Sequence, residues 1–451
     1  MSDVIAAIST GNVVSAIGIL RLTGPGCARV AGKVFLPQNG RPLWEAKNRM
    51  LTMGSLLDTQ GRVIDQCLAV YTRGPGSYTG EDTVEIQCHG SPAVLAAGLE
   101  ALYQSGARPA RRGEFTKRAF LNGRMGLTQA EAVIDLIEAE TADAAANAAG
   151  QVAGVLQQKL APVYNDLTDL CSHFHAVLDY PDEDIEDFGL DQYETTLSHC
   201  RSTLASLLST YHRGRILRGG VRVALVGKPN VGKSSLLNAL AGFDRAIVTD
   251  VAGTTRDTVE ESILLGSTRL RLIDTAGIRD CLDPIEAMGV ERSRAAAQEA
   301  DLILFLFDGS KPLDEEDRQV LELCAGRKNV IALANKRDLG TMEHSLAFDT
   351  VIPISAKTGE GLDLLTAEVE ALFASNAPCD GSLLTNTRQF DAIRRSQEAL
   401  DAALSGLSAG YTPDAVLLDV ETAMEAMGEV TGAVIREDIT SRIFERFCVG
   451  K

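Results

Sequence analysis

One segment of the chain combines glycines, a lysine and a serine in a spacing that can bind phosphate groups. It reads Gly227-Lys-Pro-Asn-Val-Gly232-Lys233-Ser234 and fits the pattern G-x-x-x-x-G-K-[ST]. In such a loop backbone N–H groups surround phosphate oxygens, the lysine reaches the terminal phosphates, and the serine hydroxyl can bind Mg²⁺. An apolar run at 221–226 precedes the loop and a helix-forming run follows it, which is the context that this chemistry requires. The segment therefore predicts a nucleoside triphosphate site, and an ordinary strand-to-helix turn is the weaker interpretation.

Two further segments carry side chains that can complete a metal and phosphate site. Asp274-Thr-Ala-Gly277 ends an apolar run, where the carboxylate can hold Mg²⁺ through water while the Gly277 N–H faces a terminal phosphate. Thr254 and Thr255 lie in Asp250-Val-Ala-Gly-Thr-Thr-Arg256 and suit a switch loop whose hydroxyl completes the metal shell. Each segment alone is a weak signal.

The choice of base is predicted from Asn335-Lys-Arg-Asp338, which follows another apolar run. The Asp338 carboxylate can accept hydrogen bonds from both N–H groups on the edge of guanine, whereas adenine would leave that charge unpaired. Ser355-Ala-Lys357 would add the Ala356 backbone N–H to the guanine carbonyl. Four elements in this order predict a GTP site. The predicted nucleotide-binding residues are Asn230, Val231, Gly232, Lys233, Ser234, Ser235, Thr249, Asp250, Val251, Ala252, Gly253, Thr254, Thr255, Asp274, Thr275, Ala276, Gly277, Asn335, Lys336, Asp338, Ser355, Ala356 and Lys357.

The hydrolytic residue must differ from that of Ras-like enzymes, which orient water with a glutamine directly after this glycine. Here Ile278 follows Gly277. Glu286 is our candidate, although spacing alone favours a solvated glutamate at a helix end. Lys233 is the second catalytic candidate. The carbonyl oxygen of Asn230 could hold a cation against the phosphates and supply the charge of an arginine finger.

The surrounding elements predict three domains in a chain of 451 residues. Apolar runs alternate with helical segments from residue 221, which predicts a parallel sheet covered on both faces. Short β-rich runs such as 17–20, 68–71 and 84–87 predict an α+β N-terminal domain. Thr128-Gln-Ala-Glu131 has the pattern of a capping box with Thr128 as N-cap, and it predicts the start of a long helical region. We expect an α+β N-terminal domain at 1–118, an all-α helical domain at 119–215 and 376–451, and an α/β P-loop (Ras-like) G domain inserted at 216–375.

Composition narrows the class of protein further. A net charge of −18 means that nucleic acid can be bound only through a local basic patch, for which Arg111, Arg112, Lys117 and Arg118 are candidates. The nine cysteines contain no C-x-x-C pair, which disfavours a disulfide framework or a zinc site and favours the reducing cytoplasm. No apolar run approaches a membrane span, and no basic segment precedes one at the N-terminus, so we expect no membrane association.

With these motifs the sequence resembles the MnmE (TrmE) family of tRNA-modification GTPases over nearly its whole length. The resemblance is carried by the nucleotide motifs and by Gly18-Ile-Leu-Arg21-Leu-Thr-Gly-Pro, Ser77-Tyr-Thr-Gly-Glu-Asp-Thr-Val-Glu85-Ile-Gln-Cys-His-Gly90, Gly113-Glu-Phe-Thr-Lys-Arg-Ala-Phe-Leu-Asn122, Gln129-Ala-Glu-Ala132, Asp179-Tyr-Pro-Asp-Glu-Asp184 and Cys448-Val-Gly-Lys451. It implies a homodimer joined through N-terminal domains. It also implies a flavin-dependent partner, MnmG, with which an aminomethyl or carboxymethylaminomethyl group is added to the wobble uridine of certain tRNAs.

The resemblance also assigns cofactors. It places K⁺ at Asn230, Thr249, Val251 and Thr254, and Mg²⁺ at Ser234 and Thr255, and it makes Glu286 the favoured general base. It implies a formyl- or methylene-tetrahydrofolate one-carbon donor bound by Arg21, Glu85, Arg124 and Lys451, with Cys448 as a candidate for the modification chemistry. Arg124 stands where relatives carry lysine, and Arg112 stands where they carry proline. Two other classes remain open: a ribosome-assembly GTPase, and a regulatory switch with no chemistry of its own.

Overall fold

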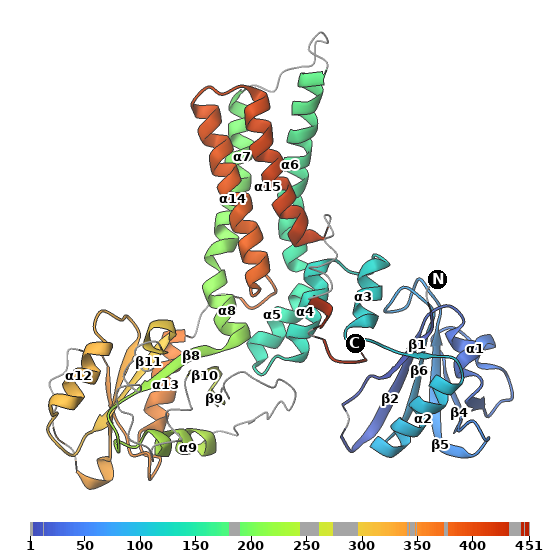
Figure 1. Ribbon diagram of the computed structural model, residues 1–451, viewed down its shortest axis with the longest axis horizontal. Helices are drawn as coiled ribbons and strands as arrows, with labels where there is room; N and C mark the ends of the chain where they lie inside the picture. The colour runs from blue at the N-terminus through green and yellow to red at the C-terminus, as the bar shows by residue number, and fades with distance from the viewer. Residues whose placement is uncertain are drawn as a thin grey trace. The chain divides into compact units, whose positions relative to one another are not determined.

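The computed structural model describes residues 3–11, 13–179, 190–243, 261–273, 296–340, 342, 348, 350–373, 378–432, 443–445 and 447–450. Contacts divide the chain into two compact units. The first comprises Met1–Ile134, Ala149–Leu204 and Ala392–Lys451, and the second comprises Asp135–Ala148 and Ala205–Asp391. The first unit holds a seven-stranded sheet and most of the long helices, and the second holds a six-stranded sheet (Figure 1).

The sheet of the first unit has the strand order β3-β4-β5-β6-β2-β1-β7. Its strands are β1 (Ile5–Ile8), β2 (Ser15–Thr23), β3 (Phe35–Pro37), β4 (Leu51–Leu57), β5 (Val63–Thr72), β6 (Thr83–Gly90) and β7 (Arg108–Pro109). Neighbouring strands are antiparallel except β1 and β7. The three β-rich runs predicted from the sequence lie in β2, β5 and β6, which confirms those predictions.

Alternating burial gives this sheet two different faces. In β6 the side chains of Val84 and Ile86 are buried, whereas Glu85 between them is partly exposed. Helices α1 (Cys27–Ala31) and α2 (Pro92–Gln104) pack with the buried residues in one hydrophobic core. The opposite face carries Glu85 and its cross-strand partner Arg21, so the sequence period of two places both polar side chains on the side away from that core.

The helical part contains α3 (Glu114–Leu121), α4 (Leu127–Ile137), α5 (Ala142–Val152), α6 (Val155–Asp179), α7 (Leu190–Ser209), α8 (Tyr211–Gly219), α14 (Thr387–Ser408) and α15 (Pro413–Thr431). Helices α6 and α15 lie side by side, and an ion pair between Arg201 and Asp401 joins α7 to α14 (Figure 1). The predicted capping box at Thr128 is wrong. Helix α4 begins one residue earlier, Thr128 is buried inside it, and Gln129 accepts the Gly126 N–H instead.

The sheet of the second unit has the order β13-β12-β11-β8-β10-β9. Its strands are β8 (Val221–Val226), β9 (Glu261–Leu265), β10 (Thr268–Ile273), β11 (Leu302–Asp308), β12 (Val330–Asn335) and β13 (Val351–Pro353). Five strands are parallel as predicted, but β9 pairs antiparallel with β10 and was not predicted. The sheet is therefore mixed.

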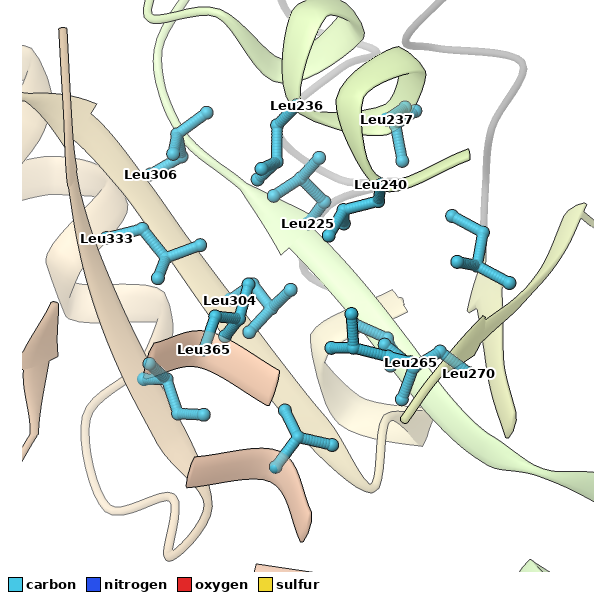
Figure 2. Close-up of a cluster of buried hydrophobic side chains, with 14 of the residues drawn as sticks. Leu225, Leu236, Leu237, Leu240, Leu265, Leu270, Leu304, Leu306, Leu333 and Leu365 are labelled. Atoms are coloured by element: carbon cyan, nitrogen blue, oxygen red, sulfur yellow. The ribbon is translucent and has the colours of Figure 1, made fainter. Parts of the chain in front are cut away.

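Helices cover both faces of this sheet. Figure 2 shows leucines of α9 (Lys233–Phe243) and α13 (Leu362–Phe373) meeting Leu225 and Leu304 of the central strands on one face. Helix α12 (Glu315–Leu323) packs on the other face against a cluster that includes Phe305. The fold class predicted from the sequence is confirmed: an α+β N-terminal domain, an all-α helical domain and an α/β P-loop G domain.

Candidate nucleotide-binding site

The predicted phosphate loop connects the end of β8 to the first residue of α9. Gly227 follows β8, and a Cβ there would lie 2.3 Å from the Leu306 carbonyl oxygen of the neighbouring strand. Gly232 has φ +102, and a Cβ there would lie 2.4 Å from Asn335 Nδ2. Backbone this close to its neighbours admits only glycine. The two fixed glycines of the motif thus allow the loop to pack against the sheet and against the segment predicted to read the base.

The lysine of the motif is folded back onto its own loop. Lys233 is the first residue of α9, and its ammonium donates to the carbonyl oxygens of Gly227 and Lys228, the latter at 3.0 Å. Asn230, at the exposed tip, has φ 61. The N–H groups at the start of a helix and its dipole attract anions. The loop therefore presents one ammonium group and a helix N-terminus on the same side, a donor set suited to phosphate oxygens.

The segment predicted to read guanine is held directly against the phosphate loop. Asn335 ends β12 and is only 3% exposed. Its Nδ2 donates to the Val231 carbonyl oxygen at 2.7 Å, and its Oδ1 accepts the Ala356 N–H at 2.9 Å. One side chain thus joins the phosphate loop, the 335–338 segment and the 355–357 segment. The structure brings three of the four predicted motifs together.

Asp338 lies beyond this junction with its carboxylate in an exposed position. One oxygen accepts the Ser355 hydroxyl at 2.8 Å, and Ser355 is itself fully buried. This hydrogen bond fixes the orientation of the carboxylate, which is needed if it is to meet two N–H groups of a planar base. The Ala356 N–H donates to Asn335 rather than standing free, so its predicted bond to the guanine carbonyl stays a prediction.

Two sets of ion pairs around the site, each including one buried carboxylate, were not predicted. Lys336 has φ 67, and its ammonium binds Asp308 at the end of β11 at 2.9 Å. Burial opposes ionisation of Asp308, but hydrogen bonds from Ser310 and the Lys336 ammonium outweigh it and lower the pKa of that carboxyl. The ion pair thereby fixes the backbone turn between Asn335 and Asp338.

The other ion pair anchors the phosphate loop to α12. Lys228 donates to Asp314 and, at 2.8 Å, to Asp317, which together form the capping box of α12. Burial alone would lower the pKa of Lys228, but the two carboxylates outweigh it and raise the pKa. No local sequence signal connects residues 86 and 89 positions apart. Lys228 also supplies one carbonyl that receives Lys233, so this pair helps to position the lysine of the motif.

Several predicted residues lie outside the described part of the chain. They are Thr249, Asp250, Val251, Ala252, Gly253, Thr254, Thr255, Asp274, Thr275, Ala276, Gly277, Glu286 and Lys451. The Mg²⁺ and K⁺ predictions are therefore represented in the structure only by Ser234 and Asn230, which are both exposed near the start of α9.

The predicted folate residues lie in the first unit. Arg21 Nε and Glu85 Oε1 are 2.7 Å apart on adjacent strands, and the Arg21 guanidinium lies 5.9 Å from the Tyr78 ring centre. Arg21 also donates to the Gly450 carbonyl oxygen at 3.5 Å. The C-terminal segment thus reaches the pair, and Gly450 with φ 104 permits its close approach to Ile8.

The remaining residues of this second site are placed differently. Arg124 is exposed on the loop after α3, with its stem 3.2 Å from a Cβ built at Gly80. Cys448 is exposed, and its carbonyl oxygen accepts the Gly113 N–H at 3.4 Å. The structure brings together Arg21, Glu85 and the residues just after Cys448, whereas within the described residues Arg124 makes no hydrogen bond or ion pair with them.

Three features define the second unit as a P-loop G domain: the mostly parallel sheet, the glycine-bounded loop at the start of α9, and the asparagine that joins this loop to the 335–338 segment. Comparison with known families identifies the whole chain. The family model of the MnmE helical domain matches residues 127–448, and that of the GTP-binding protein TrmE N-terminus matches residues 4–124. The chain belongs to the MnmE (TrmE) family.

Curated relatives match the chain from end to end. Proteins named tRNA modification GTPase MnmE from Symbiobacterium thermophilum and Roseiflexus sp. are each 42% identical to it, covering 100% of this chain and 99% of their own. The protein of that name from Clostridioides difficile is 39% identical and is covered over its full length. Among solved structures, the G domain of the T. maritima FeoB iron transporter is 28% identical over 34% of this chain and 99% of its own, with a TM-score of 0.26. No helix in the described residues is both long and apolar enough to span a membrane.

Proposed function

We propose that this protein hydrolyses GTP and acts in modification of the tRNA wobble uridine. The observation that carries the proposal is the junction made by Asn335, which packs the phosphate loop against the two segments that would surround guanine. The relatives' shared name, tRNA modification GTPase, supplies the process and supports the same reading. The residues proposed to bind the nucleotide are those predicted from the sequence.

The modification itself is tested in cells. Mass spectrometry of tRNA nucleosides should show loss of the modified wobble uridine when this protein is deleted, and its return with the wild-type gene. Unchanged wobble uridines would remove the proposed function and favour a ribosome-assembly GTPase or a regulatory switch. The chemistry is proposed to require the flavin-dependent partner MnmG, in the cytoplasm, which fits the cysteine usage.

Hydrolysis is proposed to use Lys233 and Glu286, with Mg²⁺ held by Ser234 and Thr255. Mg²⁺ bound there would neutralise charge on the phosphates, while Lys233 would exchange its loop carbonyls for phosphate oxygens. Glu286→Ala should keep nucleotide affinity and lower the single-turnover rate by about 10²- to 10⁴-fold, the usual worth of general base catalysis. Glu299→Ala, an exposed glutamate of the same unit, is the control. A wild-type rate in Glu286→Ala would assign the base elsewhere.

A potassium ion is proposed to bind beside Asn230, Thr249, Val251 and Thr254. The left-handed backbone of Asn230 at the exposed loop tip supports a site at this end of the loop. K⁺ there would supply positive charge to the transition state. Replacing K⁺ by Na⁺ at constant ionic strength should slow hydrolysis by about tenfold or more, because the smaller ion fits the same oxygen set poorly. Equal rates in the two salts would rule out the cation.

A tetrahydrofolate one-carbon donor is proposed to bind at Arg21 and Glu85, with Arg124 and Lys451, near Cys448. A pterin edge presents paired N–H donors that a carboxylate can accept. Glu85 accepts a hydrogen bond from Arg21, which orients its carboxyl group for this task. Glu85→Gln should weaken binding of formyl-tetrahydrofolate by about 10- to 100-fold, since hydrogen bonds to charged groups are worth about 1.5–3 kcal/mol. Isothermal titration measures this. Unchanged affinity would place the folate elsewhere.

The protein is proposed to form a homodimer through its N-terminal domain. Exposed apolar side chains on strands of the N-terminal sheet support pairing of two copies through this domain. They include Ile17, Leu51 and Met53, which are 59%, 51% and 46% exposed.

We propose domain boundaries at 118/119, 215/216 and 375/376. The family models divide the chain between residues 124 and 127, six residues or more beyond the first of these boundaries.

A further inference from the structure

The N-terminal domain carries a cluster of basic residues around the single tryptophan of the chain. Two short helices and two turns contribute it: α1, the 3₁₀ helix η1 (Leu43–Glu45), the residues after η1, and the turn after β5. We call this surface the Trp44 patch. It consists of Arg29, Arg41, Trp44, Lys47, Arg49 and Arg73.

Contacts join Arg29 and Arg73 to Trp44 and Arg49 to Tyr71, whereas Arg41 and Lys47 are placed by the chain, three residues on either side of Trp44. The Arg29 guanidinium lies 5.9 Å from the centre of the Trp44 ring. Arg73 donates to the Trp44 carbonyl oxygen at 3.4 Å, and its guanidinium lies 5.4 Å from the Tyr71 ring centre. The Arg49 N–H donates to the Tyr71 carbonyl oxygen at 2.9 Å. Trp44 is 39% exposed, so its ring lies beside the Arg29 guanidinium and is partly open to solvent.

The Trp44 patch lies in a segment with an excess of positive charge. Residues 27–50 contain five Lys or Arg and one carboxylate, Glu45, in a protein of net charge −18. Within the described residues, no carboxylate lies within ion-pair distance of the patch cations. A cation without an acidic partner keeps its attraction for phosphate.

The basic cluster singled out from the sequence behaves differently. Arg118 is 11% exposed and binds three carboxylates, those of Asp3, Glu81 and Glu114. Its charge is thus neutralised within the domain. Only Arg111 and Arg112 of that cluster are exposed. The Trp44 patch is therefore the better candidate for a polyanion site.

The Trp44 patch and the face of the sheet proposed for dimerisation lie on opposite sides of the N-terminal domain. Leu43 of η1 and Cys27 of α1 are buried in the same core as Leu56 and Ile86. The patch thus lies on the helix-covered side, whereas Arg21 and Glu85 point away from that core. Pairing of two copies through the open face would not cover it.

We propose that the Trp44 patch binds RNA, with its Lys and Arg side chains on phosphates and the Trp44 ring stacked on an unpaired base of a tRNA hairpin. A site for single-stranded RNA combines an exposed aromatic ring, on which a base stacks, with cations that contact phosphates. A site for a polyanion without bases would need only the cations. The inference rests on the proposed tRNA function and names the surface by which an acidic protein contacts that substrate.

The single tryptophan allows a direct test on the full-length protein. A synthetic RNA hairpin with an unmodified wobble uridine is titrated, and both the anisotropy of labelled RNA and the intrinsic fluorescence of Trp44 are followed. Stacking should quench the fluorescence with the same midpoint as the anisotropy change. Arg41→Glu/Lys47→Glu should weaken binding about tenfold or more and lower the slope of log affinity against log salt by about one per lost contact. Trp44→Phe should weaken it less than Trp44→Ala.

The matched control is Arg111→Glu/Arg112→Glu, which makes the same charge change in the same domain. It should bind RNA nearly as the wild type does. The inference fails if both double variants lose affinity equally, if Arg41→Glu/Lys47→Glu binds normally, or if the wild type binds no hairpin. Thermal unfolding shows whether each variant is folded. If Arg41→Glu/Lys47→Glu does not fold, the neutral variant Arg41→Gln/Lys47→Gln takes its place. Loss of wobble modification in deleted cells tests the proposed function separately, so the two failures are distinguishable.

Discussion

Replacing Asp338 by asparagine is expected to move base preference from guanine toward xanthine by about 10²- to 10⁴-fold. The carboxylate would accept two N–H groups of guanine, and each such hydrogen bond to a charged group is worth about 1.5–3 kcal/mol. Asparagine presents one donor in place of one acceptor, which opposes guanine and matches the extra carbonyl of xanthine. The Ser355 hydroxyl, 2.8 Å from Asp338, keeps the side chain in position in either case because a hydroxyl can donate or accept.

A competition assay between GTP and xanthosine triphosphate measures this change in base preference. Asp363→Asn, which changes an exposed carboxylate in the first turn of α13, serves as the control and should retain GTP preference. Ser355→Ala should weaken binding of both nucleotides without changing the preference for GTP, because the Ser355 hydroxyl orients the Asp338 carboxylate but does not contact the base. Retained GTP selectivity in Asp338→Asn would contradict the base-reading role.

The sequence predicted the parts of the site that depend on local pattern. Each apolar run before a motif became a parallel strand, because a strand buried on both faces needs continuous apolar residues. The motifs then met at the ends of β8 and β12. The N-cap assigned to Thr128 was wrong for a related reason: Thr128 is 3% exposed, and its tertiary burial outweighs the local preference for a cap.

Contacts between residues far apart in the chain could not be predicted from local sequence patterns. Lys228 meets Asp314 and Asp317 only because β8 and β11 are neighbours in the sheet, and no periodicity encodes that pairing. Strand β9 did have a local signal, because Gly266-Ser267 between β9 and β10 is a two-residue turn typical of a β-hairpin. The Arg21–Glu85 pair, by contrast, could be anticipated in part, since Glu85 alternates with buried neighbours, but its partner depended on strand order.

Substituting alanine for Gly232 is expected to weaken nucleotide binding strongly. The residue has φ +102, and an added Cβ would lie 2.4 Å from Asn335 Nδ2. The left-handed backbone and the forced shift together cost about 2–4 kcal/mol. Because Asn335 donates to Val231 and accepts from Ala356, displacing its amide separates the phosphate loop from both base-reading segments at once. Affinity should therefore fall by about 10²-fold or more.

Gly242→Ala provides a control within the same helix, α9. Its Cβ would meet no heavy atom within 4 Å, so alanine there should leave affinity unchanged and raise helix stability slightly. Binding of a fluorescent GDP analogue and thermal unfolding without nucleotide distinguish loss of the site from loss of the fold. If Gly232→Ala bound nucleotide as tightly as Gly242→Ala, then the Asn335 junction could not be what holds the phosphate and base sites in register. The proposed GTP site would then need another organising contact.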